Sequence, residues 1–187
     1  GRAAALGSPG GLAGAAARPP STAVLFFAGP AGSAAAAGGG GIGMQIVHDS
    51  SEFSSALNLC QSRARSAFGD DRVFVEKYIE GAQHIEFQVL ADGKNAIHFG
   101  ERFCSIQRRH QKLLEEGPWL SDEVRSEIGS KVCAGAEAVG YRGLATFEFL
   151  RDSNGDFYFL EVNPRVQVEH TVTEMITGED MVQLGKT

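Results

Sequence analysis

The chain has 187 residues, 43% of them hydrophobic, which is enough for one buried core and predicts one principal domain. Its formal net charge of −6 argues against a binding surface for nucleic acid or for anionic membranes. The apolar runs are too short to span a bilayer, which favours a soluble protein. The cysteines lack metal-ligand spacing, which favours a reduced, intracellular protein; they are Cys60, Cys104 and Cys133.

The first 37 residues are nearly all glycine, alanine, proline and serine. Such a composition offers little apolar surface to offset the entropy lost on ordering, so we expect disorder in 1–37 and a folded domain in 38–187. The glycines of 38–44 would let backbone amides close around a phosphate, because no Cβ is in the way. The alternative is that they continue the low-complexity segment.

Periodicity predicts a helix from Ser50 to about Ala67, with Ser50 or Ser51 as its N-cap. Alternating apolar residues then predict three strands, at 72–79, 84–91 and 95–100. Four polar residues on these strands fit a solvent-exposed face as well as a binding site: Glu76, His84, Glu86 and Gln88.

Three cations and a histidine lie close together within 105–116. In an acidic protein this cluster indicates either an anion site or a surface loop with salt bridges. A second helix is predicted from its cap Ser121 to Gly140, with a buried stripe formed by Val124, Ile128, Val132, Ala136 and Val139. The segment 172–183 is predicted to be helical with a break at Gly178.

The segments 144–150 and 157–163 predict a β-hairpin around Asn154-Gly155, because these two residues favour a type I′ turn. Counting outward from that turn places Glu148 opposite Glu161, and Thr146 opposite Asn163. Two ionised carboxylates side by side need a shared proton, a basic side chain or a divalent cation. The nearby amide of Asn163 favours Mg²⁺, which prefers oxygen ligands, whereas the alternative is a solvated face with a different register.

After this hairpin, three polar residues alternate with apolar ones: Arg165, Gln167 and Glu169. If the backbone stays extended, they share one side with Glu161 and Asn163.

Three motifs resemble the biotin carboxylase family: Phe-Val-Glu-Lys-Tyr at 74–78, Ser-Ile-Gln-Arg-Arg-His-Gln-Lys at 105–112, and Glu-Val-Asn-Pro-Arg-Val-Gln-Val-Glu-His at 161–170. The resemblance runs from about Gly38 to Gln183 and implies a partial ATP-grasp fold of the α+β class. The chain would comprise part of the lid subdomain and much of the catalytic sheet.

The resemblance also implies the roles of individual residues. The ATP site would contain Gly39, Gly40, Gly41, Met44, Glu76, Lys77, Ile79, His84, Gln107 and His110. The metal site, for Mg²⁺ or Mn²⁺, would be Glu148, Glu161 and Asn163. The bicarbonate pocket would be Lys112, Arg165, Gln167 and Val168, with Glu169 as the general base and Arg165 and Lys112 as further catalytic residues.

The activity implied is ATP-dependent carboxylation of biotin by bicarbonate through carboxyphosphate. Expected partners are biotin on a carboxyl carrier domain, a carboxyltransferase subunit or domain, and a second copy in a homodimer, in the cytoplasm or the mitochondrial matrix. A family lysine that binds ATP phosphates is replaced by Ala34, and the family's terminal parts are missing. We therefore expect a central fragment with weak or no activity alone. The alternatives are a non-catalytic nucleotide-binding fragment or another ATP-grasp carboxylate-amine ligase.

Overall fold

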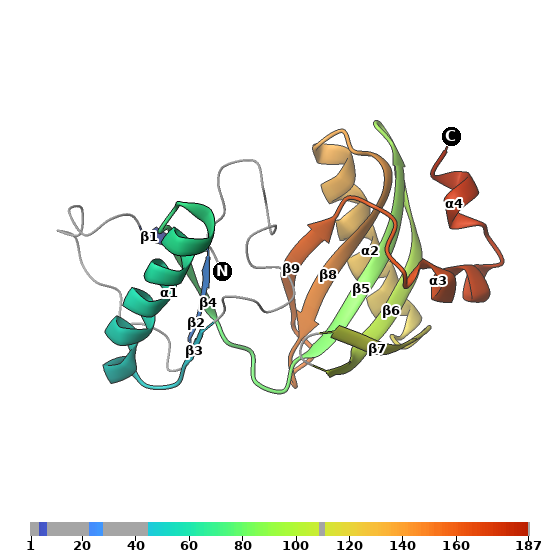
Figure 1. The fold of residues 1–187 in the computed structure, drawn as a ribbon. Helices are drawn as coiled ribbons and strands as arrows, with labels where there is room; N and C mark the ends of the chain where they lie inside the picture. Colours follow the sequence, from blue (N-terminus) through green and yellow to red (C-terminus); the bar gives the residue numbers. More distant parts are fainter. Residues whose placement is uncertain (1–3, 7–22, 28–44, 109–110, 187) are drawn as a thin grey trace. The chain divides into compact units, whose positions relative to one another are not determined.

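The structure, a computed structural model, describes residues 4–6, 23–27, 45–108 and 111–186 (Figure 1). Contacts between residues divide the chain into two compact units, Gly1–Tyr78 and Ile79–Thr187. The division after Tyr78 falls inside the segment 38–187, which we expected to form one domain. No helix in the described part of the chain is long and apolar enough to cross a membrane.

The first unit holds a four-stranded antiparallel sheet in the order β1 (Ala4–Leu6), β4 (Val73–Lys77), β2 (Ala23–Phe27) and β3 (Gln45–Val47). Strands β1 and β2 lie within the segment 1–37, for which disorder in solution stays a prediction. Both strands pair through their backbone, β1 with β4, and β2 with β3 and β4. The remainder of 1–37 lies outside the described residues.

A short 3-10 turn (Ser50–Glu52) leads into helix α1 (Phe53–Phe68), where the sequence predicted a helix. The cap is Asp49 rather than a serine, since its carboxylate accepts a hydrogen bond from the backbone amide of Ser51 at 2.8 Å. The core of this unit is small and consists of Val47, Ala56, Cys60, Ala64 and Val73.

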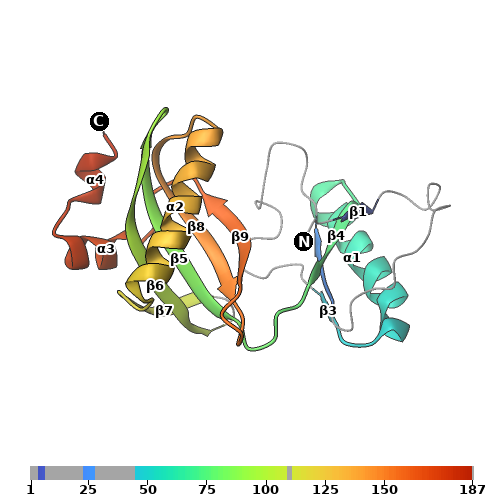
Figure 2. The same cartoon turned by 180° about the vertical axis from the view of Figure 1, so that it is seen from behind.

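The second unit is built on a five-stranded antiparallel sheet in the order β7-β6-β5-β8-β9. Its strands are β5 (Gln83–Asp92), β6 (Ala96–Arg108), β7 (Gln111–Glu116), β8 (Arg142–Arg151) and β9 (Phe157–Asn163). Helix α2 (Asp122–Ala138) lies along one face of the sheet (Figure 2). Two short helices, α3 (His170–Thr177) and α4 (Met181–Leu184), follow β9, and Gly178 separates them in the left-handed conformation.

Residues 105–108 and 111–116 belong to a pair of strands, because β6 continues to Arg108 and β7 pairs with it. The sequence predicted only the first part of β6, at 95–100. The predicted cap of α2 is confirmed, because the Ser121 hydroxyl accepts a hydrogen bond from the amide of Val124. The predicted stripe was wrong at Val139, which is 76% exposed because α2 ends at Ala138.

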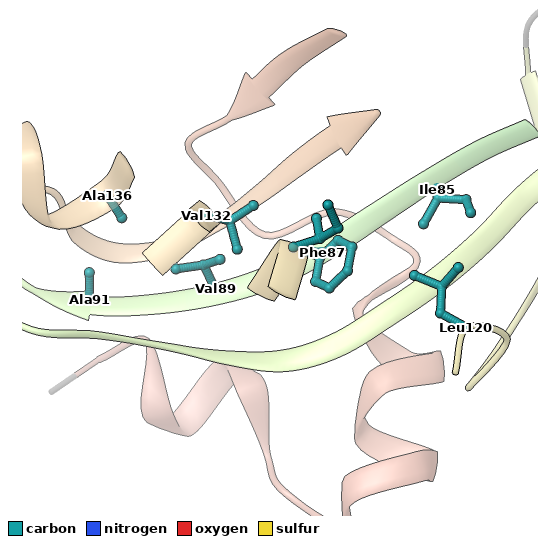
Figure 3. Packing of buried hydrophobic residues seen from close by; sticks show 8 residues of the cluster. Ile85, Phe87, Val89, Ala91, Leu120, Val132 and Ala136 are labelled. Atoms are coloured by element: carbon teal, nitrogen blue, oxygen red, sulfur yellow. The ribbon is translucent and has the colours of Figure 1, made fainter. Parts of the chain in front are cut away.

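The side chains of β5 alternate between the two faces of the sheet, as expected for an extended strand. Ile85, Phe87, Val89 and Ala91 point toward α2 and form the core with its residues Ile128, Val132 and Ala136 (Figure 3). Burying a valine, isoleucine or phenylalanine side chain contributes about 1.5–3 kcal/mol. This apolar core therefore fixes the opposite, polar face of the strand.

The β8–β9 hairpin pairs Glu148 with Glu161 and Thr146 with Asn163, as the sequence predicted. The turn itself differs: the amide of Gly155 donates to the carbonyl of Asp152 at 3.1 Å, so Ser153 and Asn154 are the central turn residues. A bulge at Leu160 then shifts the register by one residue, between the pairs Phe149–Phe159 and Glu148–Glu161.

Candidate active site

A group of buried charged side chains occupies the polar face of the second sheet. We refer to five of these residues as the charged cluster: Glu86, Arg102, Lys112, Glu148 and Glu169. They come from β5, β6, β7, β8 and the turn before α3, so the sheet brings together positions far apart in sequence. Glu86 and Arg102 are fully buried and Glu148 is 5% exposed. Buried charges at this density must be paired to be tolerated.

Lys112 forms ion pairs with all three carboxylates of the charged cluster. Its Nζ contacts Glu86 Oε2, and lies 3.0 Å from Glu169 Oε1 and 3.4 Å from Glu148 Oε1. Burial by itself would lower the pKa of Lys112, but the charges of Glu86 and Glu148 more than offset this, and the pKa is raised. The ammonium group therefore stays charged at neutral pH.

Glu148 is held by four polar neighbours. His84 Nε2 lies 2.6 Å from its Oε2, and Asn163 Nδ2 and Gln167 Nε2 donate to its Oε1 at 2.8 and 3.1 Å. Burial alone would raise the pKa of Glu148, but the contact with His84 and the charge of Lys112 outweigh it and lower the pKa to about 2. This carboxylate is thus ionised over the whole physiological range.

The residues predicted to hold a metal ion lie together. The Asn163 amide group bridges the two carboxylates, since its Nδ2 also donates to Glu161 Oε1 at 3.2 Å. Rotating this amide by 180° would turn its oxygen toward the same carboxylates. The set of two carboxylates and one amide oxygen fits a hard divalent cation such as Mg²⁺.

The loop after β9 does not stay extended, which corrects the expectation for Arg165, Gln167 and Glu169. The Arg165 amide donates to the carbonyl of Asn163 at 2.9 Å, and the backbone turns into α3 at His170. Gln167 is buried beside Glu148, and Glu169 reaches Lys112. Arg165 is instead exposed and donates to the carbonyl of Val166 at 3.3 Å.

Val168, which we expected in the bicarbonate pocket, is 88% exposed. The turn toward α3 therefore separates it, together with Arg165, from the buried Gln167 and the partly buried Glu169. Burial alone would raise the pKa of Glu169, whereas hydrogen bonds from its own backbone amide and from Lys112 lower the pKa below its usual value.

Of the residues expected near ATP, His84 and Gln107 lie side by side, with His84 Nδ1 2.6 Å from Gln107 Nε2. Glu76 and Lys77 lie on β4 of the first unit, and burial raises the pKa of the half-buried Glu76. Ile79 is half-buried at the start of the second unit. The other expected residues lie outside the described residues: Gly39, Gly40, Gly41, Met44 and His110.

Sequence reasoning missed Arg102 and left Glu86 and Gln88 undecided between a solvent-exposed face and a binding site. All three are buried on the polar face, and Arg102 contacts both of the others. The alternation of β5 places His84, Glu86 and Gln88 on one side, which could have indicated this face. Nothing local to Arg102 could have done so, because its partners come from other strands.

Comparison with known proteins identifies the family of the chain. Residues 30–185 match the family model of the carbamoyl-phosphate synthase L chain, ATP binding domain. A biotin carboxylase of Allochromatium vinosum is 54% identical over 146 residues, which are 76% of this chain and 32% of that protein. A biotin carboxylase of Haemophilus influenzae is 49% identical over 76% of this chain and 32% of its own length. The chain thus spans about a third of the length of these curated relatives.

Solved structures give the same result. The biotin carboxylase domain dimer of Hydrogenobacter thermophilus 2-oxoglutarate carboxylase, in complex with MgADP, ADP and bicarbonate, superposes with a TM-score of 0.77 at 45% identity. The match covers 87% of this chain and 35% of that one. The biotin carboxylase–β,γ-ATP complex of Campylobacter jejuni also gives 0.77, at 47% identity over 88% of this chain and 36% of that one. The fold is a partial ATP-grasp fold, and the chain belongs to the family of the carbamoyl-phosphate synthase L chain ATP-binding domain, in which its relatives are biotin carboxylases.

Proposed function

We propose that this chain carries the central part of a biotin carboxylase, in which ATP and bicarbonate give carboxyphosphate and the carboxyl group passes to biotin. The observation that carries the proposal is the position of Lys112, whose ammonium lies between Glu169 and the Glu148 carboxylate. A charged, partly enclosed ammonium group can bind an anion, and an ionised carboxylate beside it can take a proton from that anion.

Glu169 has the state that a proton acceptor needs. It is ionised at neutral pH, as an ordinary glutamate would be, and its lowered pKa makes it a weaker base; its place 3.0 Å from Lys112, which would hold the anion, is what favours transfer of the proton of bicarbonate. Gln167 supports this geometry, because its Nε2 is fixed on Glu148 while its Oε1 is buried without a hydrogen-bond partner among the described residues. A buried acceptor of this kind suits a hydroxyl donor such as that of bicarbonate.

Two further members of the bicarbonate pocket, Arg165 and Val168, are proposed from the resemblance, and their side chains are exposed. Glu148, Glu161 and Asn163 would hold Mg²⁺, which would neutralise phosphate charge during the transfer. The proposed ATP contacts are those expected from the sequence, including His84 and Gln107.

Since the chain spans about a third of its relatives, the remaining parts of a carboxylase would be needed for full activity. The proposed partners are a biotin carboxyl carrier domain and a carboxyltransferase. A homodimer is proposed from the domain dimer of the Hydrogenobacter protein. We expect weak turnover from this chain alone, because Ala34 stands where a family lysine binds phosphate.

The test is single-turnover release of ADP from ATP, measured with and without bicarbonate and free biotin. In the parent chain, both additions should increase release. Glu169→Gln should lower the bicarbonate-dependent rate of ADP release at least about a hundredfold and leave ATP binding unchanged, because the variant loses only the proton acceptor.

Glu127→Gln is the matched control. Glu127 is exposed on α2, where it pairs with Lys131 at 2.6 Å, and it makes none of the contacts of the charged cluster described above. Its replacement should leave the bicarbonate effect in place. Bicarbonate-dependent release that survives in Glu169→Gln would contradict the assignment. Release that needs an amine instead of biotin would indicate a carboxylate-amine ligase, and ATP binding without release would indicate a non-catalytic fragment.

A further inference from the structure

Arg102 is a fully buried arginine that the proposed reaction does not use directly. All three of its nitrogens are hydrogen-bonded. Nε donates to Glu86 Oε1 at 2.7 Å, Nη1 to Gln88 Oε1 at 2.9 Å and to Thr173 Oγ1 at 2.6 Å, and Nη2 to Thr146 Oγ1 at 3.4 Å. An arginine of this kind, in which four of the five N–H groups of the planar guanidinium donate hydrogen bonds, fixes the relative positions of its partners.

The partners of Arg102 connect the sheet to the start of α3. Glu86 and Gln88 are on β5, and Thr173 lies in the first turn of α3. Thr173 follows Glu169 by four residues, which is about one helical turn. The bond between Arg102 and Thr173 therefore determines where α3 begins and, with it, where the Glu169 carboxylate lies.

Arg102 also shares the carboxylate of Glu86 with Lys112. One oxygen of Glu86 accepts from Arg102 and the other contacts Lys112. Without Arg102, Lys112 would be the only lysine or arginine of the charged cluster left for three carboxylates, namely the buried Glu86 and Glu148 and the partly buried Glu169. Its ammonium would then be drawn toward Glu86, because an unpaired buried carboxylate is costly.

From these two observations we propose that Arg102 is a positioning residue, which sets the place of Lys112 through Glu86 and the place of Glu169 through Thr173. Its consequence for bicarbonate chemistry rests on the proposed function, but the arrangement itself does not. A purely structural role would stabilise the unit without any effect specific to Lys112.

The experiment uses the whole chain labelled with ¹⁵N-lysine, and follows two readouts that need no activity. One is the Nζ signal of Lys112, assigned by its loss in Lys112→Gln. The other is amide hydrogen exchange of α3. Arg102→Met should shift or remove the Lys112 signal and speed α3 exchange by about tenfold or more, because a charged hydrogen bond is lost.

Three variants separate the two connections. Thr173→Val should speed α3 exchange and change the Lys112 signal less than Arg102→Met does, because it leaves the contacts of Glu86 with Arg102 and Lys112 in place and acts on Lys112 only through Glu169. Arg102→Lys should restore most of the Lys112 signal, since it keeps the charge beside Glu86, but not the full protection of α3. Arg125→Met is the control: it removes the ion pair with Glu101, the neighbour of Arg102 on β6, and should change neither readout.

If bicarbonate-dependent ADP release is measurable, Arg102→Met should lower the rate at saturating substrates at least tenfold without changing the KM for ATP. Absence of release in the parent chain would count against the proposed function only. A folded Arg102→Met with an unshifted Lys112 signal would overturn the positioning role. If Arg102→Met does not fold, unchanged α3 exchange in Thr173→Val would overturn the connection between Arg102 and α3.

Discussion

Replacing Glu161 by glutamine removes one of two facing carboxylates while it preserves the shape of the side chain. Asn163 Nδ2 donates to Glu148 at 2.8 Å and to Glu161 at 3.2 Å, so the two accepting oxygens are at most 6.0 Å apart. At this separation two unit charges repel by about 0.7–2.8 kcal/mol for effective dielectric constants of 80 to 20. Lys112 offsets part of this for Glu148.

Without metal, Glu161→Gln should therefore be no less stable than the parent and up to about 1 kcal/mol more stable. With Mg²⁺ the order should reverse. A cation that binds only the folded state at about a hundredfold its Kd adds about 2.7 kcal/mol to the parent, and the variant should lose most of this gain.

The assay is thermal or urea unfolding with EDTA and with increasing MgCl₂. Glu127→Gln is a suitable control, because it removes a surface charge that pairs with Lys131 on α2, far along the chain from the hairpin. It should leave the Mg²⁺ effect unchanged. Clear destabilisation of Glu161→Gln in EDTA would refute the reasoning, because it would mean that a basic group already neutralises Glu161.

Two predictions concern the scaffold. Glu101 is 3% exposed and accepts from the amides of Trp119 and Leu120 and from Arg125, so Glu101→Gln should lower the free energy of unfolding by about 2–4 kcal/mol at pH 7. Burial would raise the pKa of Glu101, but Arg125 and the two amides lower it, so its stabilisation is present above about pH 4.5 and is lost as the pH falls further. Urea unfolding at pH 7 and pH 3 should show the difference between parent and variant shrinking, and an equal difference at both would contradict this account. Gly129→Ala should cost about 1–3 kcal/mol, since its Cβ would lie 2.3 Å from His98 Nε2. Gly135→Ala on the same helix meets its nearest atom, in Phe147, at 3.7 Å and should be neutral or stabilising by up to about 1 kcal/mol, which thermal unfolding would check.

The carboxylate pair was predictable because both residues lie on one hairpin, yet the prediction was correct through two compensating differences. The actual turn centres on Ser153 and Asn154, one residue earlier than expected, and the bulge at Leu160 restores the register beyond it. Continuing the register of the turn without the bulge would place Glu161 opposite Phe147. Local turn propensity gives no information on such a bulge.

Helix α2 was also predictable, since a capping serine and a stripe of apolar residues are local patterns. Arg102 was not, because its four partners come from β5, β8 and α3, which only the assembled sheet brings together. The loop from Asn163 to His170 was misjudged for a related reason. Alternation of polar residues predicts an extended strand, whereas the contacts of Gln167 with Glu148 and of Glu169 with Lys112 accompany a turn into α3.

The central position of β5 limits how its sequence can vary. Every residue from Ile85 to Val89 is buried, with alternate side chains in the apolar core and on the polar face. No position in this stretch should therefore accept substitutions without effect, because a change affects either the stability of the fold or the charged cluster. Insertion of one residue would exchange the two faces over the rest of the strand, whereas insertion of two would preserve them. Lineages of this protein should accordingly accept insertions at the Gly93 turn or the Ser153-Asn154 turn, and none within 85–89.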